Sequence, residues 1–252
     1  MNRELIRANL NLYAVMQNLE ELPKLDAEIG ELIRDWKIVI QFSVLNGPSA
    51  HVSFENGVCV HGRGAHPAPS VRLFFTSPQH LNRMIDGSGT PIPLKGFSKL
   101  SFLQKDFAQM TERLERYLKP TNGLIQDDAF LRANTTMTLF TAAYGVRELA
   151  TLDPLCQSIA AQTPRGALLM GIENGPQVQI RLAENGVTVA KGPTEHPTAV
   201  MMFRNFVVAN ALLNSRTDAF TAVAEGELVL RGMLPIVDNV GLIMDRIQGY
   251  LV

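Results

Sequence analysis

Residues 220–250 read FTAVAEGELVLRGMLPIVDNVGLIMDRIQGY, and this stretch holds the elements that decide the fold. A short helix over residues 217–225 is followed by a glycine break at Gly226. A short apolar strand over residues 228–230 ends at a second glycine, Gly232, and apolar residues at helical spacing then predict a closing helix. The rest of the chain shows whether this arrangement occurs once or twice.

Length and composition indicate a globular protein. The 252 residues are enough for one large domain or two of ordinary size. Hydrophobic residues make up 46% of the chain and charged residues 19%, which is typical of a protein with a packed core. The net charge is −1 and no block of lysine or arginine is present, so we expect no nucleic-acid partner.

The cysteines and the N-terminus indicate the cellular setting. Cys59 and Cys156 lie in different predicted elements without a spacing pattern, so we expect two buried thiols in a reducing compartment. The N-terminus is charged and helical and lacks the apolar core of a signal peptide. No apolar run reaches the roughly 18 residues that a membrane span needs. We therefore expect a soluble, cytoplasmic protein.

Helices and strand pairs alternate along the chain. Pro23 is expected to end a first helix, and Ser77 before Pro78 is typical of a helix start. Helices are predicted over residues 2–22, 25–36, 78–86, 98–118, 128–149, 154–163 and 205–213. Strands are predicted over residues 37–45, 49–54, 58–61, 71–76, 91–95, 167–172, 177–182, 187–190 and 199–203.

The hairpin near residue 56 is interpreted from the faces of its strands. If residues 55–57 form a three-residue loop, Phe54 pairs with Val58 and both apolar side chains lie on one face. A two-residue loop would put Phe54 and Val58 on opposite faces. We therefore expect the three-residue loop.

Several motifs recur at nearly constant distance, which indicates a duplicated fold. Asn46-Gly47-Pro48 recurs as Asn174-Gly175-Pro176, Glu55-Asn56-Gly57-Val58 as Glu184-Asn185-Gly186-Val187, His66-Pro67 as His196-Pro197, and Leu94-Lys95-Gly96 as Leu230-Arg231-Gly232. The offset is 128 for the first motif and 129 for the second, which places one extra residue inside the second hairpin loop. It is 136 for the last, so eight extra residues are expected around residues 217–225, and the first copy is expected to lack that short helix.

The predicted fold is α+β, with two tandem copies over residues 1–122 and 123–252. Neighbouring hairpins predict that each copy has a mostly antiparallel five-stranded sheet covered by helices on one face.

Residues 150–250 resemble the sterol carrier protein 2 family. The resemblance rests on the strand at 200–203, the helix end at 212–215, the aspartate-led helix at 218–224, the block GELVLRG at 226–232 and the closing helix. It reaches the first copy through residues 71–75, 85–87 and 94–96, so the second copy is the better match. The resemblance implies two sterol-carrier-like domains, and an apolar tunnel for fatty acyl chains, acyl-CoA or sterols in a non-enzymatic carrier.

The candidate ligand-binding residues are apolar side chains of the second copy. An acyl chain gains about 0.8 kcal/mol for each CH₂ that it buries, and methionine suits an adaptable apolar wall. The predicted lining is Phe203, Phe206, Val207, Leu212, Phe220, Met233, Val237, Val240, Met244 and Ile247. We expect the pocket between the helix at 217–225 and the closing helix; the alternative is that these residues simply fill a core.

The closing helix has a wide apolar stripe and is terminal, so we expect little besides packing to hold it. It is interpreted as a lid, as an element for transient membrane contact, or as a plain core helix. Enzyme chemistry has no residue pattern in its favour: there is no GxSxG motif, and the five histidines lack metal-site spacing. We expect no cofactor and no metal.

A second hypothesis is a structural or interaction module with filled cores that acts as a homo-oligomer, with a homodimer as the simplest case. The helix at 98–118 favours it, because its apolar residues follow a near-heptad stripe that suits helix pairing. The stripe consists of Leu103, Phe107, Met110, Leu114 and Tyr117.

Overall fold

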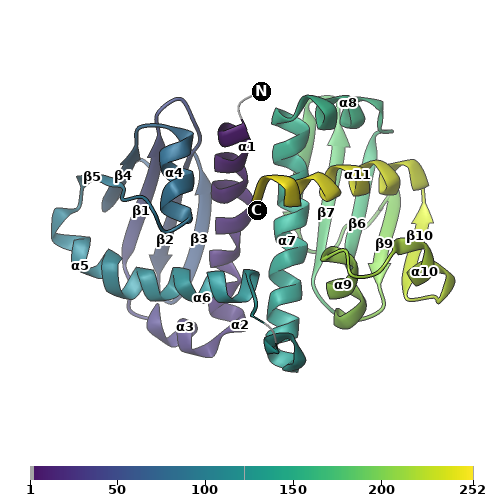
Figure 1. Cartoon of the computed structure of the whole chain (residues 1–252), viewed down its shortest axis with the longest axis horizontal. Helices are drawn as coiled ribbons and strands as arrows, with labels where there is room; N and C mark the ends of the chain where they lie inside the picture. Colours follow the sequence, from purple (N-terminus) through teal and green to yellow (C-terminus); the bar gives the residue numbers. More distant parts are fainter. Residues whose placement is uncertain (1–2, 122, 252) are drawn as a thin grey trace. The chain divides into compact units, whose positions relative to one another are not determined.

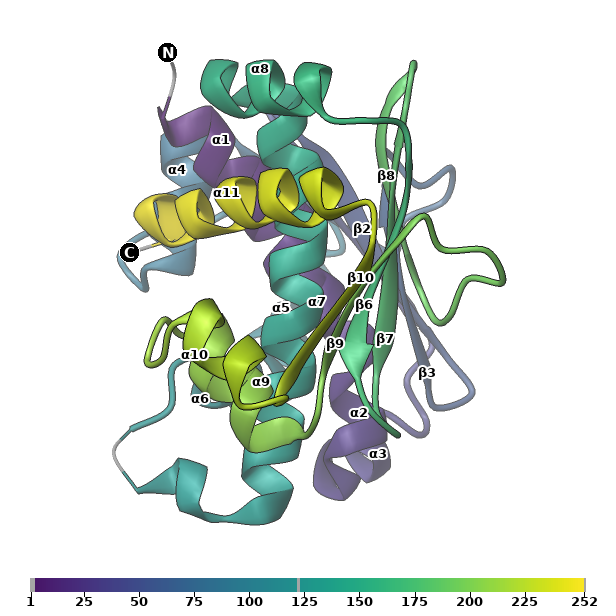
Figure 2. The same ribbon diagram turned by 90° about the vertical axis from the view of Figure 1, so that its right-hand side faces the viewer.

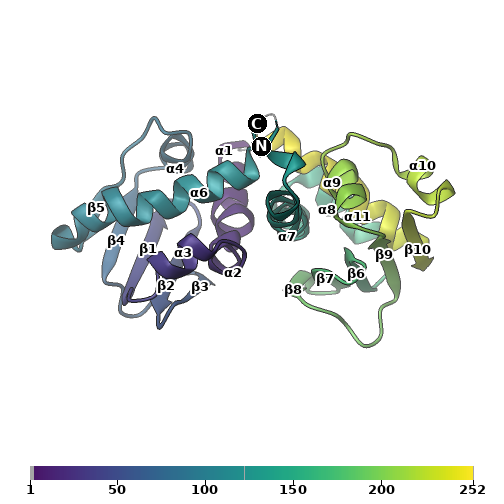
Figure 3. The same ribbon diagram turned by 90° about the horizontal axis from the view of Figure 1, so that it is seen from below.

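A computed structural model of the chain describes residues 3–121 and 123–251 (Figure 1). The chain divides into two compact units, Met1–Thr121 and Asn122–Val252. Each unit has a five-stranded sheet with its helices on one face (Figures 2 and 3). No described helix is long and apolar enough to cross a membrane.

The sheet of the first unit has the order β3-β2-β1-β4-β5. Its strands are β1 (Ile38–Val44), β2 (Ser49–Glu55), β3 (Val58–Arg63), β4 (Val71–Phe75) and β5 (Ile92–Lys95). The pair β1–β4 is parallel and the other pairs are antiparallel. Helix α4 (Pro78–Ile85) connects β4 to β5, and the Ser77 side chain caps it by accepting a hydrogen bond from the His80 amide.

The second sheet has the order β10-β9-β6-β7-β8, with β6–β9 as its parallel pair. Its strands are β6 (Gly166–Ile172), β7 (Gln177–Ala183), β8 (Gly186–Lys191), β9 (Ala199–Phe203) and β10 (Leu228–Gly232). The predicted α+β class and the two five-stranded sheets are confirmed, and each sheet is mixed, with one parallel pair.

The helices of the first unit are less regular than the sequence predicts. The segment predicted as one helix over residues 2–22 divides into α1 (Arg3–Leu10), a π-helical turn (Asn11–Val15) and a 3₁₀ segment (Met16–Glu20). Pro23 does not end this segment but lies in the first turn of α2 (Leu22–Leu25), where its missing N–H needs no partner. Helix α3 (Ala27–Leu32) follows. The later helical segment comprises a 3₁₀ turn (Phe97–Lys99), α5 (Leu100–Phe102), a π-helical turn (Leu103–Phe107) and α6 (Ala108–Leu118).

The second unit begins with a 3₁₀ turn (Leu124–Gln126) and the long helix α7 (Asp128–Leu152), followed by α8 (Pro154–Gln162). Helix α9 (Phe206–Leu213) and helix α10 (Ala219–Ala224) lie between β9 and β10, and α11 (Leu234–Leu251) closes the described chain. Asp127, Asp153, Asn205 and Asp218 cap α7, α8, α9 and α10 through their side chains, which explains where these helices begin.

The hairpin between β2 and β3 corrects the sequence prediction. Glu55 pairs with Val58 and Phe54 with Cys59, so the loop has two residues. Asn56 and Gly57 both have positive φ, 52° and 73°, as a tight type I′ turn requires. The predicted three-residue loop is wrong, and Val58 is 56% exposed whereas Cys59 is buried beside Phe54.

The two sheets match position for position. The pair Ile38–Phe54 in the first corresponds to Gly166–Leu182 in the second, and both members are shifted by 128 residues. Both hairpins between the second and third strands have two-residue loops, so the extra residue predicted in the second loop is wrong. The two hairpins have the same length, but the motif Glu-Asn-Gly-Val begins one position later in the second hairpin than in the first.

The offset changes between the fourth and fifth strands of each sheet. Arg72 pairs with Lys95 in the first unit, and Val200 pairs with Arg231 in the second, so the offset rises from 128 to 136 there. Helix α10 lies in this interval of the second unit. No helix lies between α4 and β5 among the residues that the structure describes in the first unit.

A cluster of aromatic rings, buried at Phe54 and Phe107 and partly buried at Trp36 and Phe102, joins the helices of the first unit to its sheet. The Trp36 ring lies 5.0 Å from Phe54 and 4.7 Å from Phe102, and Phe54 lies 6.3 Å from Phe107, all edge to face. Such pairs contribute about 0.5–1.5 kcal/mol beyond the area that they bury. The helical segment 97–118 is therefore held against its own sheet by this cluster.

Candidate functional site

The helix-facing side of the second sheet is fully buried at its centre and only partly buried toward its edges. Met170 of β6 is fully buried. Met170 pairs with Met201 of β9, and Met201 pairs with Leu230 of β10, so all three side chains lie on the same face. Met201 and Leu230, however, are only partly buried. The helices therefore leave apolar surface accessible at the β9–β10 margin.

Helices α9, α10 and α11 supply further apolar side chains that are accessible. Leu212 of α9 and Met244 of α11 are partly buried. Phe220 of α10 is 90% exposed, and Met233, between β10 and α11, is 41% exposed. Ala222, on the other side of α10, is buried, so this short helix packs through a small side chain and presents its large one outward.

The ten predicted lining residues fall into three groups. Four belong to the core: Phe203, Val237, Val240 and Ile247 are at most 5% exposed. Phe206, Leu212 and Met244 are partly buried, and Val207, Phe220 and Met233 are exposed. Met201 and Leu230 are not in the predicted lining. Each stands two positions from a buried residue of the same face, Phe203 on β9 and Leu228 on β10, and this period of two identifies the face from the sequence.

Phe206 has a separate environment. Its ring is covered by the Arg132 guanidinium, whose Cζ lies 4.7 Å from the ring centre. The far end of the ring also approaches Gly175, in the turn after β6, so closely that a side chain there would meet it at 3.2 Å. Phe206 thus packs against α7 and a turn.

The closing helix is held by more than packing, contrary to the sequence expectation. Asp153, fully buried at the start of α8, accepts hydrogen bonds from Arg246 at 2.9 Å and from the Tyr250 hydroxyl at 2.7 Å. Burial alone would raise the pKa of Asp153, but the bonds from Tyr250 and Arg246 outweigh it and hold that pKa below its ordinary value. Hydrogen bonds and an ion pair to Asp153 therefore hold the last two turns of α11 against the start of α8.

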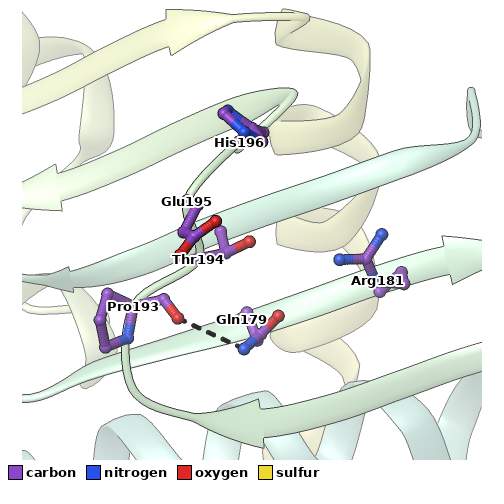
Figure 4. Close-up of a pocket in the computed structure, with 6 residues that line it drawn as sticks. All are labelled: Gln179, Arg181, Pro193, Thr194, Glu195 and His196. Carbon is purple, nitrogen blue, oxygen red and sulfur yellow. Dashed lines mark hydrogen bonds between the residues drawn. The ribbon is translucent and has the colours of Figure 1, made fainter.

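A hollow of about 460 Å³ lies elsewhere in the same unit (Figure 4). It is lined by Gln179, Arg181, Pro193, Thr194, Glu195 and His196. Gln179 and Arg181 alternate along β7 with the buried Val178, Ile180 and Leu182, so the hollow lies on the sheet face opposite the helices. None of the predicted lining residues contributes to it.

The histidines of the first unit have structural contacts. A ring nitrogen of His61 lies 2.7 Å from the Leu12 carbonyl, and burial lowers the pKa of this side chain to about 4. His80 lies 2.8 Å from the Thr90 carbonyl. Across the described ranges, no three His, Cys, Asp or Glu side chains are grouped so that they could hold a metal ion.

No family model matches the chain, and no curated protein matches it. Among solved structures, the sterol carrier protein domain 2 of Helicoverpa armigera has a TM-score of 0.36 and 14% identity, covering 44% of this chain and 89% of that one. The SCP2 domain of the ubiquinone synthesis protein UbiJ has a TM-score of 0.33 and 16% identity, with coverages of 42% and 89%. The sec-alkylsulfatase Pisa1 of Pseudomonas sp. has a TM-score of 0.26 and 10% identity, with coverages of 58% and 28%. These likenesses are weak and establish neither a family nor an activity.

Proposed function

We propose that the C-terminal unit reversibly binds an apolar small molecule, such as a fatty acyl chain, an acyl-CoA or a sterol-like lipid, without catalysing a reaction. The observation that carries this proposal is the accessible pair Met201 and Leu230 on the helix-facing side of a sheet whose centre is fully buried. The resemblance of residues 150–250 to sterol carrier protein 2 supports the same function.

The chemistry of this margin suits an acyl chain. Met201, Met233 and Met244 bring unbranched, polarisable side chains that adapt to ligands of different shape. Each CH₂ that moves from water onto such a surface gains about 0.8 kcal/mol. Phe220, at 90% exposure, is available to cover a bound chain.

In this proposal the two units are copies of one sterol-carrier-like domain, and the second is the better match. The described part of the first unit has no counterpart of α10, and its Trp36–Phe54–Phe102–Phe107 cluster lies between helix and sheet. Its role is then structural. The two cysteines, both buried and reduced, suit a cytoplasmic carrier.

A fluorescent fatty-acid titration of the full chain tests the proposal. We expect saturable binding that Phe220→Ser weakens about tenfold, which corresponds to about 1.4 kcal/mol. The matched control is Phe97→Ser, because Phe97 is a 64% exposed phenylalanine of the first unit, and its loss should leave the affinity unchanged. The carrier hypothesis would be wrong if the chain bound none of the three lipid classes, fatty acids, acyl-CoA and sterols.

The alternative is an interaction module that forms a homo-oligomer. The helical stripe predicted for pairing does not favour it, because Phe107, Met110 and Leu114 are at most 8% exposed, and the Phe107 ring packs on Phe54 of the same unit. The exposed Phe220, Val223 and Met233 are the better candidates for a contact between copies. Native mass spectrometry separates the two hypotheses, since a carrier gains the mass of a lipid whereas an oligomer gains the mass of a second chain.

A further inference from the structure

The loop between β3 and β4 and the loop between β8 and β9 leave their sheets in the same way. In the first unit, the amides of Gly64 and Ser70 donate to the backbone of β2 and β1 at 2.6 and 2.9 Å. In the second unit, the amides of Gly192 and Thr198 donate to β7 and β6, each at 2.8 Å. The two loops have equal length and are held at both ends in the same way, so they differ in how the middle of each loop is attached to its sheet.

In the first unit a buried glutamine fastens the middle of the loop. Gln41 of β1 is 1% exposed, and its side-chain oxygen accepts a 2.7 Å hydrogen bond from the His66 amide. His51, the partner of Gln41 on β2, places a ring nitrogen 3.2 Å from the Gly64 carbonyl. The rings of His51 and His66 also pack edge to face at 5.0 Å. These contacts hold the middle of the β3–β4 loop against strands β1 and β2.

The described residues of the second unit form no counterpart of these attachments. Leu169 occupies the register position of Gln41, and its partner on β7 is Gln179 in place of His51. Leucine cannot hydrogen-bond the loop. Within the described ranges, the Gln179 side chain donates one hydrogen bond, to the Pro193 carbonyl at 3.4 Å, which is at the long limit for such a bond. The hollow of about 460 Å³ opens where the first unit has its closed loop.

Opposite charges line this hollow without neutralising each other. Arg181 lies on β7 and Glu195 on the loop; Figure 4 shows Thr194 beside Glu195, and Gln179 on the same strand as Arg181. No described residue forms an ion pair or hydrogen bond with the side chain of Arg181, Glu195 or Thr194. Other arginines of the unit have partners: Arg165 pairs with Glu184, and Arg246 with Asp153. The hollow therefore offers a ligand a guanidinium, a carboxylate, the His196 imidazole and the hydrogen-bonding side chains of Gln179 and Thr194.

We propose that this hollow binds a small zwitterion that carries a carboxylate and an ammonium group, as a free amino acid does. The carboxylate pairs with Arg181, whose planar guanidinium matches two oxygens at once. The ammonium group pairs with Glu195, and Gln179 and Thr194 complete the hydrogen bonds. The polar lining makes this site separate from the apolar margin at β9–β10, so either can fail without the other.

Amide-resolved NMR of the full chain, titrated with glycine, tests this site. Saturable shifts are expected at Gln179, Arg181 and residues 194–196. Arg181→Gln and Glu195→Gln should each weaken binding about tenfold, whereas Arg165→Gln, which removes an exposed arginine already paired, should not. Acetate and methylammonium, which each carry one of the two charges, should bind about tenfold more weakly than glycine.

Three results would overturn the proposal: no saturable shift with glycine, an unchanged affinity in Arg181→Gln, or acetate binding as tightly as glycine. Circular dichroism of each variant shows that it is folded. The three substituted residues are exposed, so their replacement is not expected to unfold the chain.

Discussion

The hydroxyl of Tyr250 donates a 2.7 Å hydrogen bond to the carboxylate of Asp153, which joins the end of α11 to the start of α8. Asp153 also accepts hydrogen bonds from the backbone amides of Leu155 and Cys156. This one buried side chain therefore caps the start of α8 and also holds the end of α11. A buried carboxylate keeps its charge only where such partners compensate the loss of water. The closing helix is consequently a fixed element at its C-terminal end.

Tyr250→Phe removes one of these partners and keeps the ring. We expect the free energy of unfolding to fall by about 1–2 kcal/mol, because the carboxylate then lacks one of its hydrogen bonds. Urea unfolding followed by circular dichroism measures this change. The pKa of Asp153 is lowered in the folded protein, so its contribution is present above the unfolded-state pKa and is lost as the pH falls through the folded-state pKa. An unchanged free energy of unfolding in Tyr250→Phe would contradict this account of the network.

His61 predicts a second pH dependence, in the first unit. Its pKa is about 4 in the folded protein against an ordinary 6.5, because burial disfavours the charged ring. The unfolded chain therefore binds more protons between these values. The contribution of neutral His61 to the free energy of unfolding is complete above pH 6.5 and is lost as the pH falls toward 4. The loss in the free energy of unfolding is at most about 3 kcal/mol.

The fluorescence of Trp36, the one tryptophan of the chain, reports unfolding of this unit. In His61→Gln, the free energy of unfolding of the first unit should change less between pH 6.5 and pH 4 than in the wild type. The control is His196→Gln, which replaces an exposed histidine of the second unit. A pH profile that is the same in wild type and His61→Gln would rule out this role.

Two helical glycines of the second unit predict opposite effects of the same substitution. A Cβ on Gly145 of α7 would meet the Cδ1 of Ile247 at 2.6 Å, whereas a Cβ on Gly241 of α11 would meet nothing within 4 Å. Gly145→Ala should destabilise by about 1–3 kcal/mol through overpacking. Gly241→Ala should stabilise by up to about 1 kcal/mol, because alanine favours the helix. Thermal unfolding of both variants checks the sign, and equal effects would show that α11 does not pack closely over Gly145.

Sequence patterns predict the order of helices and strands because capping side chains mark where helices begin and glycine turns mark where strands and helices end. They failed at the β2–β3 hairpin, where Val58 and Val60 look like core residues but are at least half exposed. The turn conformation of Asn56-Gly57 decided that register, against the preference of the valines for burial.

The candidate site could be predicted only in part. Helical spacing identifies the apolar face of α11, but it does not show which residues on that face stay accessible, and Val237 and Val240 are in the core. The attachment of Arg246 and Tyr250 to Asp153 joins residues more than 90 positions apart, and no local pattern reveals it. The polar hollow was missed because its residues come from a strand and a loop that have no shared motif.

The most direct test of the carrier hypothesis is photo-crosslinking of the full chain with a diazirine-bearing fatty acid, followed by peptide mapping. We expect labels on the strands and helices around Met201, Leu230 and Met244, and we expect unlabelled fatty acid to reduce this labelling. Labels confined to the first unit, or none that an unlabelled fatty acid displaces, would contradict the carrier hypothesis.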